Sequence, residues 1–425
     1  GFVQGQRKDG TQEEGLKGLK RSAMAWRLCA TGLAVVLGFV QGQERGTCDG
    51  CAGTEDTVLL QHTANASKPT RSYRRYGGAS VACYEAIRET QEAWRQAILA
   101  VSKSYRDDPN GDFVHLAEGA IHELYGYDIG PVLFKPTKAV KQPFRPTVIG
   151  ALSYFVGYDA LKLTGYPEDG GFAINDGDTW SEVKFDNDEI NCERDLAIAH
   201  GEYFFTSAKG GEPVRVEYSF VYRRMMDGKL KIILHHSSAP YKPPPEAALV
   251  QVRSLGAKPY YQKSPEPCYK DIEATQMAWK NAILSISDSY KQGGDDFVYV
   301  AEDAIHELYG YDIGPVLFKP TKAVKQPFRP TVIGALSYFV GYDNIKHDGF
   351  AEDTGFAING GDGWTGVEFD NDEINCMGNF LFAQGYYYFT NENGRVGVEY
   401  SFGYQKMKNG KVKIILHHSS VPFSA

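Results

Sequence analysis

The chain has 425 residues, of which 42% are hydrophobic and 23% are charged, and its net charge is −8. This composition is that of an ordinary globular protein, and it excludes a collagen-like, coiled-coil or wholly disordered chain. The balance of 45 Lys and Arg against 53 Asp and Glu argues against nucleic acid as a partner, because nucleic-acid-binding proteins normally have a basic face. Seven cysteines are too few for a disulfide scaffold.

Residues 1–80 have the features of a targeting or disordered region. Basic residues up to Arg27 precede a mostly apolar run over 28–40, which is typical of a secretory signal peptide. This run is shorter than the ~20 residues of a membrane span, so we expect no stable membrane span in the mature form. A buried helix or a weak anchor is the alternative. A following stretch that ends at Arg75 is either a transit-like element or a spacer, so a plastid and the cell exterior both stay open as destinations.

An internal repeat organises the rest of the chain. Residues 120–159 are identical to residues 304–343, and further matches surround them in the same order. Solenoid repeats have periods of about 20–50 residues, so this much longer period indicates two whole domains. We expect a first domain over 81–241 and a second over 266–425, joined by a Pro-rich linker over 242–265.

Helices come first in each repeat. In the first repeat, apolar spacing predicts a long amphipathic helix over 84–105 and a shorter helix over 112–124. A short extended segment over 132–134 follows. Pro146 then predicts the first turn of a helix over 147–155, since proline is favoured at that position.

Strands follow the helices. Segments rich in Val, Ile, Tyr and Phe predict four strands, at 181–192, 195–207, 214–226 and 229–238. Asp227-Gly228, with its counterpart Asn409-Gly410, predicts a two-residue hairpin, because that turn needs positive φ at both positions. Helices followed by an antiparallel meander predict an α+β fold. A long N-terminal helix packed on a curved antiparallel sheet leaves a conical cavity between them.

The last predicted strand ends in two histidines and two serines. Strand alternation sends His235 and Ser237 to one face and His236 and Ser238 to the other. One pair therefore points into the cavity, while the other faces solvent or a partner. Parity alone does not decide which pair is which, and structural histidines at a strand end are the alternative interpretation.

The histidines do not form a repeated metal site. A catalytic zinc needs three convergent ligands, whereas adjacent histidines on a strand diverge. His115 and His200 are replaced in the second repeat by Tyr299 and Gln384. We therefore predict a protein without a metal cofactor, although manganese and zinc are not excluded.

Two cysteines recur in each repeat. Cys83 and Cys192 correspond to Cys268 and Cys376, one pair in each domain. Disulfides within each domain are one option, but four cysteines allow three pairings. Reduced, partly buried thiols are the alternative, which we favour.

Four motifs occur in both repeats: HELYGYDIG at 122–130, KPT at 135–137, ALSYFVGYD at 151–159 and HHSS at 235–238. Together they resemble iota-class carbonic anhydrases, relatives of the calcium/calmodulin-dependent protein kinase II association domain. The resemblance covers about 320 residues in two tandem copies. It implies two cystatin-like (SnoaL-like) cone domains that catalyse the reversible hydration of CO2 to bicarbonate.

The resemblance also implies a set of site residues. They are Thr137, Tyr154, His235 and Ser237 in the first repeat, and Thr321, Tyr338, His417 and Ser419 in the second. Family members divide over metal use, and the lack of a shared three-ligand set favours a metal-free site here. We hypothesise that hydroxyls hold a water against CO2, with Phe134 as an apolar wall. His235 is the predicted proton acceptor, because the pKa of histidine lies nearest neutrality.

Two other functions stay open at this stage. One is an oligomerising, ligand-binding module without chemistry, as the kinase association domain would be. The other is an isomerase or cyclase, which needs an acidic base; Glu123 and Glu307 are shared but are expected on a helix flank. Two like domains also predict an internal pseudo-dimer or a homodimer.

Overall fold

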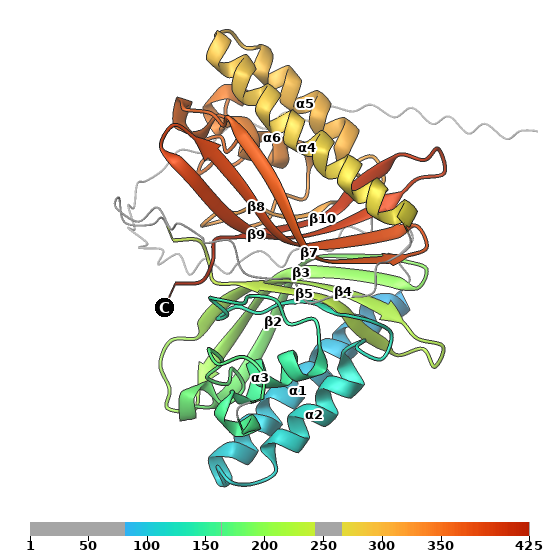
Figure 1. The fold of residues 1–425 in the computed structure, drawn as a ribbon, viewed down its shortest axis with the longest axis vertical. Coiled ribbons are helices and arrows are strands. Elements are labelled where there is room, and N and C mark those ends of the chain that lie inside the picture. The colour runs from blue at the N-terminus through green and yellow to red at the C-terminus, as the bar shows by residue number, and fades with distance from the viewer. Residues whose placement is uncertain (1–80, 163, 243–265, 425) are drawn as a thin grey trace, which may run out of the picture. The chain divides into compact units, whose positions relative to one another are not determined.

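A computed structural model describes residues 81–162, 164–242 and 266–424 (Figure 1). The predicted signal segment over 28–40 and nearly all of the predicted linker lie outside the described residues. The described residues of both repeats belong to one compact unit. Within the described ranges, no helix is both long enough and apolar enough to cross a membrane.

Each repeat contains helices followed by strands, as the sequence predicts. The first contains α1 (Val81–Asp107), α2 (Phe113–Leu124), β1 (Leu133–Lys135), α3 (Val148–Val156), β2 (Trp180–Glu193), β3 (Leu196–Ser207), β4 (Val214–Arg224) and β5 (Leu230–Ser238). The second contains α4 (Glu266–Gln292), α5 (Asp296–Leu308), β6 (Leu317–Lys319), α6 (Val332–Val340), β7 (Gly366–Met377), β8 (Phe380–Asn391), β9 (Gly394–Lys406) and β10 (Val412–Ser420). The α+β fold in two tandem copies is confirmed.

The strands of each repeat form one five-stranded sheet. The order is β1-β5-β4-β3-β2 in the first repeat and β6-β10-β9-β8-β7 in the second. Strands β2 to β5 form the predicted antiparallel meander. The short strand β1 adds a parallel edge beside β5, which places Phe134 opposite His235. Strand β5 therefore lies inside the sheet, with a neighbour on each side.

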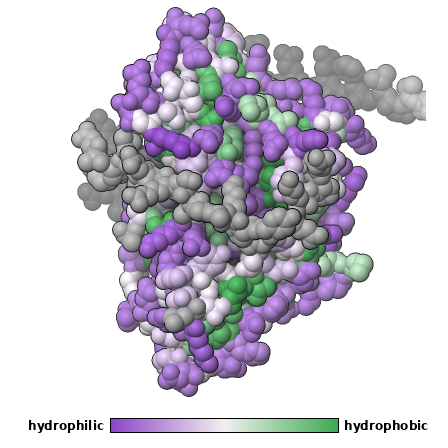
Figure 2. All heavy atoms as spheres, in the orientation of Figure 1, coloured by the Kyte–Doolittle hydropathy of each residue, from purple (hydrophilic) through white to green (hydrophobic). Residues whose placement is uncertain are grey.

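Helices cover one face of each sheet. Figure 1 shows α1 and α2 on the first sheet and α4 and α5 on the second. Ile87, Trp94 and Ile98 of α1 are buried in the core between helix and sheet, at the predicted helical spacing. Polar side chains cover most of the described surface on the face shown in Figure 2, with small hydrophobic patches between them. The large apolar side chains are thus mostly inside.

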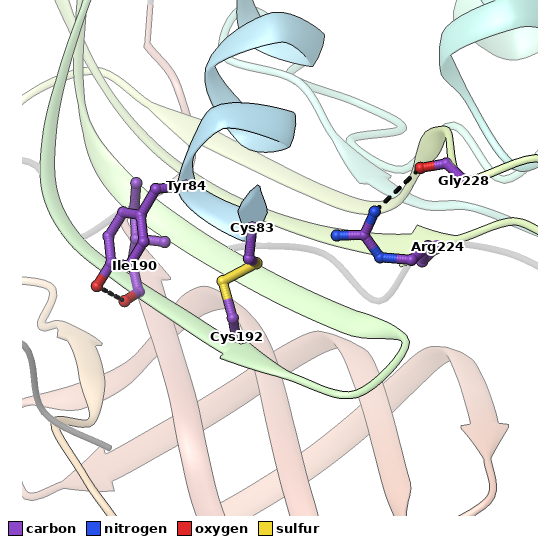
Figure 3. The surroundings of a disulfide bond; sticks show 6 residues. All are labelled: Cys83, Tyr84, Ile190, Cys192, Arg224 and Gly228. Atoms are coloured by element: carbon purple, nitrogen blue, oxygen red, sulfur yellow. Dashed lines mark hydrogen bonds between the residues drawn. A yellow bond between two sulfur atoms is a disulfide. The ribbon is translucent and has the colours of Figure 1, made fainter. Parts of the chain in front are cut away.

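A disulfide ties the start of α1 to the end of β2 (Figure 3). Cys83 is bonded to Cys192, and Tyr84 beside it donates a hydrogen bond of 3.3 Å to the carbonyl of Ile190. Cys268 and Cys376 form the same bond in the second repeat. The expectation of reduced thiols is therefore wrong. Its cause is distance in sequence: 109 residues separate the first pair, and nothing local indicates that α1 returns to the end of β2.

Helix α3 begins one residue later than predicted. Thr147 is its N-cap, and the threonine hydroxyl accepts a hydrogen bond of 3.2 Å from the backbone N–H of Gly150. Pro146 therefore precedes the cap and does not form the first helical turn. A threonine that can accept from the helix N-terminus is a stronger start signal than the proline before it.

The sheet faces opposite the helices bring the two repeats into contact, as Figure 1 shows. A shared apolar cluster lies there; its buried members are Leu133, Leu196, Ile198, Val221, Ile233, Leu234, Leu317, Phe382 and Leu416. The contact is reciprocal. Asn191 donates to the carbonyl of Pro315, and Asn375 donates to the carbonyl of Pro131, both at 2.6 Å.

Candidate active site

The alternation of β5 places one His–Ser pair inside the first repeat. The ring of His235 stacks on Phe134 at 4.6 Å and meets the edge of Phe220 at 4.2 Å, both between ring centroids. His236 lies on the opposite face and hydrogen-bonds to Ser401 of the second repeat. The structure thus answers the question that strand parity leaves open, with His235 and Ser237 on the helix-covered side.

A chain of hydrogen bonds holds His235. The indole N–H of Trp94 donates to the hydroxyl of Tyr125 at 3.0 Å, and that hydroxyl lies 2.9 Å from Nδ1 of His235. On the other side of the ring, Nε2 lies 3.2 Å from Oγ of Ser237 and 3.3 Å from the hydroxyl of Tyr203. Both ring nitrogens therefore have hydroxyl partners.

The order of donors in this chain fixes the tautomer of His235. An indole N–H can only donate, so the oxygen of Tyr125 accepts from Trp94 and uses its own proton toward Nδ1. A neutral imidazole that accepts at Nδ1 carries its proton on Nε2. Nε2 then donates toward Ser237, which leaves the proton of the serine hydroxyl available for another acceptor.

Tyr203 joins the remaining candidates to this chain. Burial raises the pKa of Tyr203, and the neighbouring hydroxyls of Ser237 and Thr137 partly offset that rise. Thr137 acts in the same way on Tyr154, whose hydroxyl also accepts from the backbone N–H of Lys138 at 3.4 Å. The structure therefore brings all four predicted residues of the first repeat into one cluster.

The second repeat contains the same arrangement. Tyr309 lies 2.9 Å from Nδ1 of His417, and Ser419 Oγ lies 2.8 Å from Nε2 of that histidine. Tyr387 donates to Ser419 Oγ at 2.5 Å. Burial raises the pKa of Tyr387, and the hydroxyls of Ser419 and Thr321 partly offset that rise. Tyr338 takes the place of Tyr154, and its hydroxyl accepts from the backbone N–H of Lys322 at 3.4 Å.

Sequence reasoning missed two tyrosines in each cluster, Tyr125 with Tyr203 and Tyr309 with Tyr387. Tyr125 lies within the repeated HELYGYDIG motif, from which no site residue was predicted. Tyr203 lies in β3 among other aromatic residues. These tyrosines recur at equivalent positions in both repeats, which was the only signal in the sequence. Because the two repeats are so similar, many other residues recur as well, and recurrence does not separate site residues from the rest.

Burial keeps the cluster electrically neutral. It lowers the pKa of His235 well below the ordinary value of 6.5, so the ring is uncharged at pH 7. It raises the pKa of Tyr154 and of Tyr203 above the ordinary value of 10, so both phenols keep their protons. The site offers neutral hydrogen-bond donors inside apolar walls, an arrangement that favours a developing negative charge on a small ligand.

A small apolar cavity of about 20 Å³ adjoins this cluster. Trp94 and Tyr125 line it, together with Ala97, Ala117 and Phe155. Its volume is close to that of one water-sized molecule. Trp94 and Tyr125 thus border both this cavity and the hydrogen-bond chain to His235.

Within the described residues, no group of three or more His, Cys, Asp or Glu side chains is placed to hold a metal ion. His115, one of the unshared histidines, lies on α2 with 76% of its side chain exposed, 3.8 Å from Glu118. His200 is buried at the contact between the repeats, where its ring packs against Phe328 at 4.4 Å.

Comparison with known proteins identifies the family. The model of a family described as metal-independent carbonic anhydrase matches residues 85–239 and 270–421. The chain belongs to the metal-independent carbonic anhydrase family. Both family segments contain a complete hydroxyl–imidazole cluster, so the tandem organisation predicted from the internal repeat agrees with two matched copies of the family.

The chain is also similar to individual proteins. A metal-independent carbonic anhydrase of Nostoc sp. is 40% identical over 153 residues, which is 36% of this chain and 71% of that protein. A cyanobacterial iota-carbonic anhydrase solved with bicarbonate is 35% identical, with a TM-score of 0.35, over 40% of this chain and 99% of the other. A kinase II association-domain structure from Thiobacillus denitrificans is 13% identical, with a TM-score of 0.22, over 33% and 94%.

The family membership confirms the predicted resemblance to iota-class enzymes and the predicted activity, carbonic anhydrase. The binding module and the isomerase or cyclase are therefore set aside. The family description also agrees with the prediction of a reaction without a metal cofactor.

Proposed function

We propose that each repeat hydrates CO2 to bicarbonate, and dehydrates bicarbonate to CO2, in its hydroxyl–imidazole cluster. The observation that supports this proposal is the contact of the Tyr203 and Ser237 hydroxyls with neutral His235 inside apolar walls. Thr137 and Tyr154 are neighbours of Tyr203 in the same cluster. The matching cluster around His417 supports a second active cavity.

The reaction places a water oxygen on the carbon of CO2. One electron pair of a C=O bond moves to the oxygen that becomes anionic, and one water proton leaves to a base in solution. Neutral hydroxyl donors aimed at that oxygen stabilise the charge that develops on it, and more strongly in a buried site than in water. Fixed hydroxyls also hold water and CO2 in attack geometry, which replaces the activation that a metal ion would give.

His235 has a different part in this proposal from the proton acceptor of the sequence hypothesis. Tyr125 supplies a proton toward Nδ1, so Nε2 carries the ring proton and donates toward Ser237. The serine hydroxyl is then oriented to donate to the reacting oxygen. His235 thereby acts as a positioning donor, and the water proton leaves without first charging the buried ring.

An apolar wall serves the uncharged substrate. Phe134 stacks against His235, and the small cavity beside Trp94 and Tyr125 extends the apolar surroundings. CO2 has no net charge and little affinity for a polar surface, so it partitions into such a space more readily than bicarbonate does. Bicarbonate instead needs the hydroxyl donors, so the two sides of the site suit the two reactants.

The test removes hydroxyls in both repeats at once. A variant with Thr137→Ala, Ser237→Ala, Thr321→Ala and Ser419→Ala should lose at least ~100-fold in kcat/KM for CO2 hydration, measured by stopped flow, because single oxyanion donors are worth about that much. The matched control, Thr90→Ala with Thr275→Ala, removes hydroxyls that only bond to carbonyls of their own helices. Unchanged activity in the four-site variant would overturn the assignment.

We also propose that residues 1–80 direct the protein into the secretory route, with a plastid or the exterior as the destination. The apolar run over 28–40 after Arg27 supports this proposal. Residues 1–80 fused to a fluorescent protein should carry it into the secretory route. A fusion that stays in the cytosol would contradict the proposal.

The two repeats, 81–241 and 266–425, are proposed to act as an internal pseudo-dimer. Their reciprocal contacts through Asn191 and Asn375 support this arrangement. Light scattering of the purified chain tests whether it also forms a homodimer, with one chain mass expected if the internal contact replaces an intermolecular one. A mass of two chains would favour the homodimer.

A further inference from the structure

Two buried ion pairs cross between the repeats. Nζ of Lys135, on β1 of the first repeat, lies 2.7 Å from Oε2 of Glu399, on β9 of the second. Nζ of Lys319 lies 2.9 Å from Oε2 of Glu217 in the reverse sense. The lysine side chains are 1% exposed and the glutamates 0%. Buried charges are retained only with a partner, so each repeat depends on the other for the partner of its lysine.

Each lysine also contacts the proposed site of its own repeat. Lys135 donates to the backbone carbonyl of Ser237 at 3.2 Å, and Lys319 donates to the carbonyl of Ser419 at 3.0 Å. The ammonium group of Lys135 therefore binds the carboxylate of Glu399 in the second repeat and the backbone carbonyl of Ser237 in its own repeat. The serine carbonyl is an acceptor next to the side chain that must point at the substrate.

The residue between His235 and Ser237 is held by the second repeat as well. His236 hydrogen-bonds to Ser401 through Nδ1 at 2.9 Å and to Ser420 through Nε2 at 3.0 Å. Its ring stacks on that of His418, with 3.8 Å between centroids and 11° between planes. The end of β5 is thus fixed on its outer face by contacts that exist only when the repeats are together.

We infer that Glu399 and Glu217 are positioning residues that act across the repeats, each holding the catalytic serine of the other repeat through Lys135 or Lys319. The inference rests on the proposed function, since it takes Ser237 and Ser419 as the donors to the reacting oxygen. Without Glu399, the ammonium of Lys135 has no carboxylate in its buried site, and it either loses its proton or shifts away from the carbonyl. A displacement of about 1 Å at a catalytic group lowers a rate by about 100-fold.

The test uses protein with one working cavity. Ser419→Ala leaves the first cavity active, and in this background Glu399→Gln should lower kcat for CO2 hydration about tenfold. Glu217→Gln breaks an equally buried pair, although Glu217 also lies 3.6 Å from Arg215. Glu217 has no contact with Lys135; it is linked to Ser237 through the 3.4 Å contact with Ser238 and through the pairing of β4 with β5. The fall in kcat caused by Glu217→Gln should therefore be at least threefold smaller than the fall caused by Glu399→Gln. In the Ser237→Ala background the order of the two effects should reverse.

The reversal separates positioning of the serine from a general loss of stability. A given glutamate substitution should destabilise the fold equally in both backgrounds, whereas its effect on positioning depends on which serine remains. Equal losses from both glutamates in both backgrounds, or no loss from either, would overturn the inference. Failure of the proposed function would look different: full activity would remain after both serines are replaced, whatever the glutamates are.

A second variant guards against loss of folding. Lys135→Met with Glu399→Leu removes both members of the pair and leaves no unpaired buried charge, a change that many proteins tolerate. In the Ser419→Ala background this variant should keep its melting temperature within a few degrees and still lose activity about tenfold. Full activity of a folded double variant would overturn the inference.

Discussion

The hydroxyl of Tyr125 lies 2.9 Å from Nδ1 of His235, and Tyr309 repeats this contact with His417 at the same distance. Each tyrosine determines which nitrogen of the histidine carries the proton. Phenylalanine at both tyrosine positions would leave Nδ1 without its donor and allow the tautomer that no longer donates to the serine. We expect kcat for CO2 hydration to fall about tenfold, equivalent to the ~1.4 kcal/mol of one hydrogen bond.

The matched control lies two residues along. Tyr127 and Tyr311 donate to the carbonyls of Arg145 and Arg329, away from the histidines. Phenylalanine at these two positions removes the same chemical group, so it should lower stability slightly and leave kcat within about twofold. Similar kcat values for the two double variants would contradict the part assigned to Tyr125.

The histidines of the clusters should remain uncharged well below neutral pH. Burial lowers the pKa of His235 and of His417 far below 6.5, and Lys319 adds to the effect at His417. The NMR signals of their ring nitrogens should therefore show no protonation between pH 8 and pH 6, and kcat/KM should show no step from them there. A titration with a midpoint near 6.5 would support a proton-accepting histidine instead.

The same burial makes the fold sensitive to acid. In the folded state His236 and His418 also have pKa values far below 6.5, so the unfolded chain binds more protons at these positions. The contribution of these histidines to the free energy of unfolding is therefore fully present above about pH 6.5. It is lost as the pH falls below that value, by up to about 1.4 kcal/mol per pH unit for each buried histidine. Glu373 has the opposite sign, because burial raises its pKa to about 7. We expect the free energy of unfolding, measured with urea, to be lower at pH 5.5 than at pH 7.5. An equal or greater free energy of unfolding at pH 5.5 would contradict this prediction.

Loss of the disulfides should lower stability. Cys83 and Cys192 are 109 residues apart, and Cys268 and Cys376 are 108 apart, so each bond closes a long loop of the unfolded chain. Each bond is expected to contribute about 2–4 kcal/mol. Thermal unfolding with and without dithiothreitol measures the effect. A variant with all four of these cysteines changed to serine is the control, and its melting temperature should not respond to the reductant; an unresponsive wild type would show that the bonds add nothing.

One difference between the repeats suggests a stabilising change. Both ring nitrogens of His200 lack a hydrogen-bond partner of suitable geometry, although Asp188 lies 3.3 Å from Nε2. Gln384, at the equivalent position, donates to Ser401 at 2.9 Å and to the carbonyl of Leu133 at 3.3 Å. His200→Gln should therefore raise the free energy of unfolding by about 1 kcal/mol. Urea unfolding of the variant checks this, and a decrease would show that the ring contact with Phe328 matters more.

Local patterns predicted the elements well. The helix expected over 84–105 spans Val81–Asp107, and the strand expected over 229–238 spans Leu230–Ser238. Helical spacing is a property of neighbouring residues, so a sequence displays it directly. The two-residue turn predicted at Asp227-Gly228 is wrong in detail: only Gly228 has positive φ there, and Met225 and Lys229 close a three-residue loop. The parallel pairing of β1 with β5 joins residues about 100 positions apart, and no local pattern indicates it.

The site was predicted only in part, and for a similar reason. Motifs shared by both repeats pointed to the four candidate residues of each cluster, but 27 tyrosines gave no sign that Tyr125 and Tyr203 contact His235. Strand alternation separated His235 from His236 without showing which face each would occupy. The ion pair of Lys135 with Glu399 joins residues of different repeats, so only the folded chain reveals it.

The most direct measurement of the central claim is CO2 hydration by the wild-type chain after exhaustive removal of metal ions, with metal content checked by mass spectrometry. The hydroxyl–imidazole clusters need no ion, so the stripped protein should keep its full activity, and added Mn²⁺ or Zn²⁺ should not increase it. Activity that disappears on stripping and returns with either ion would contradict the account.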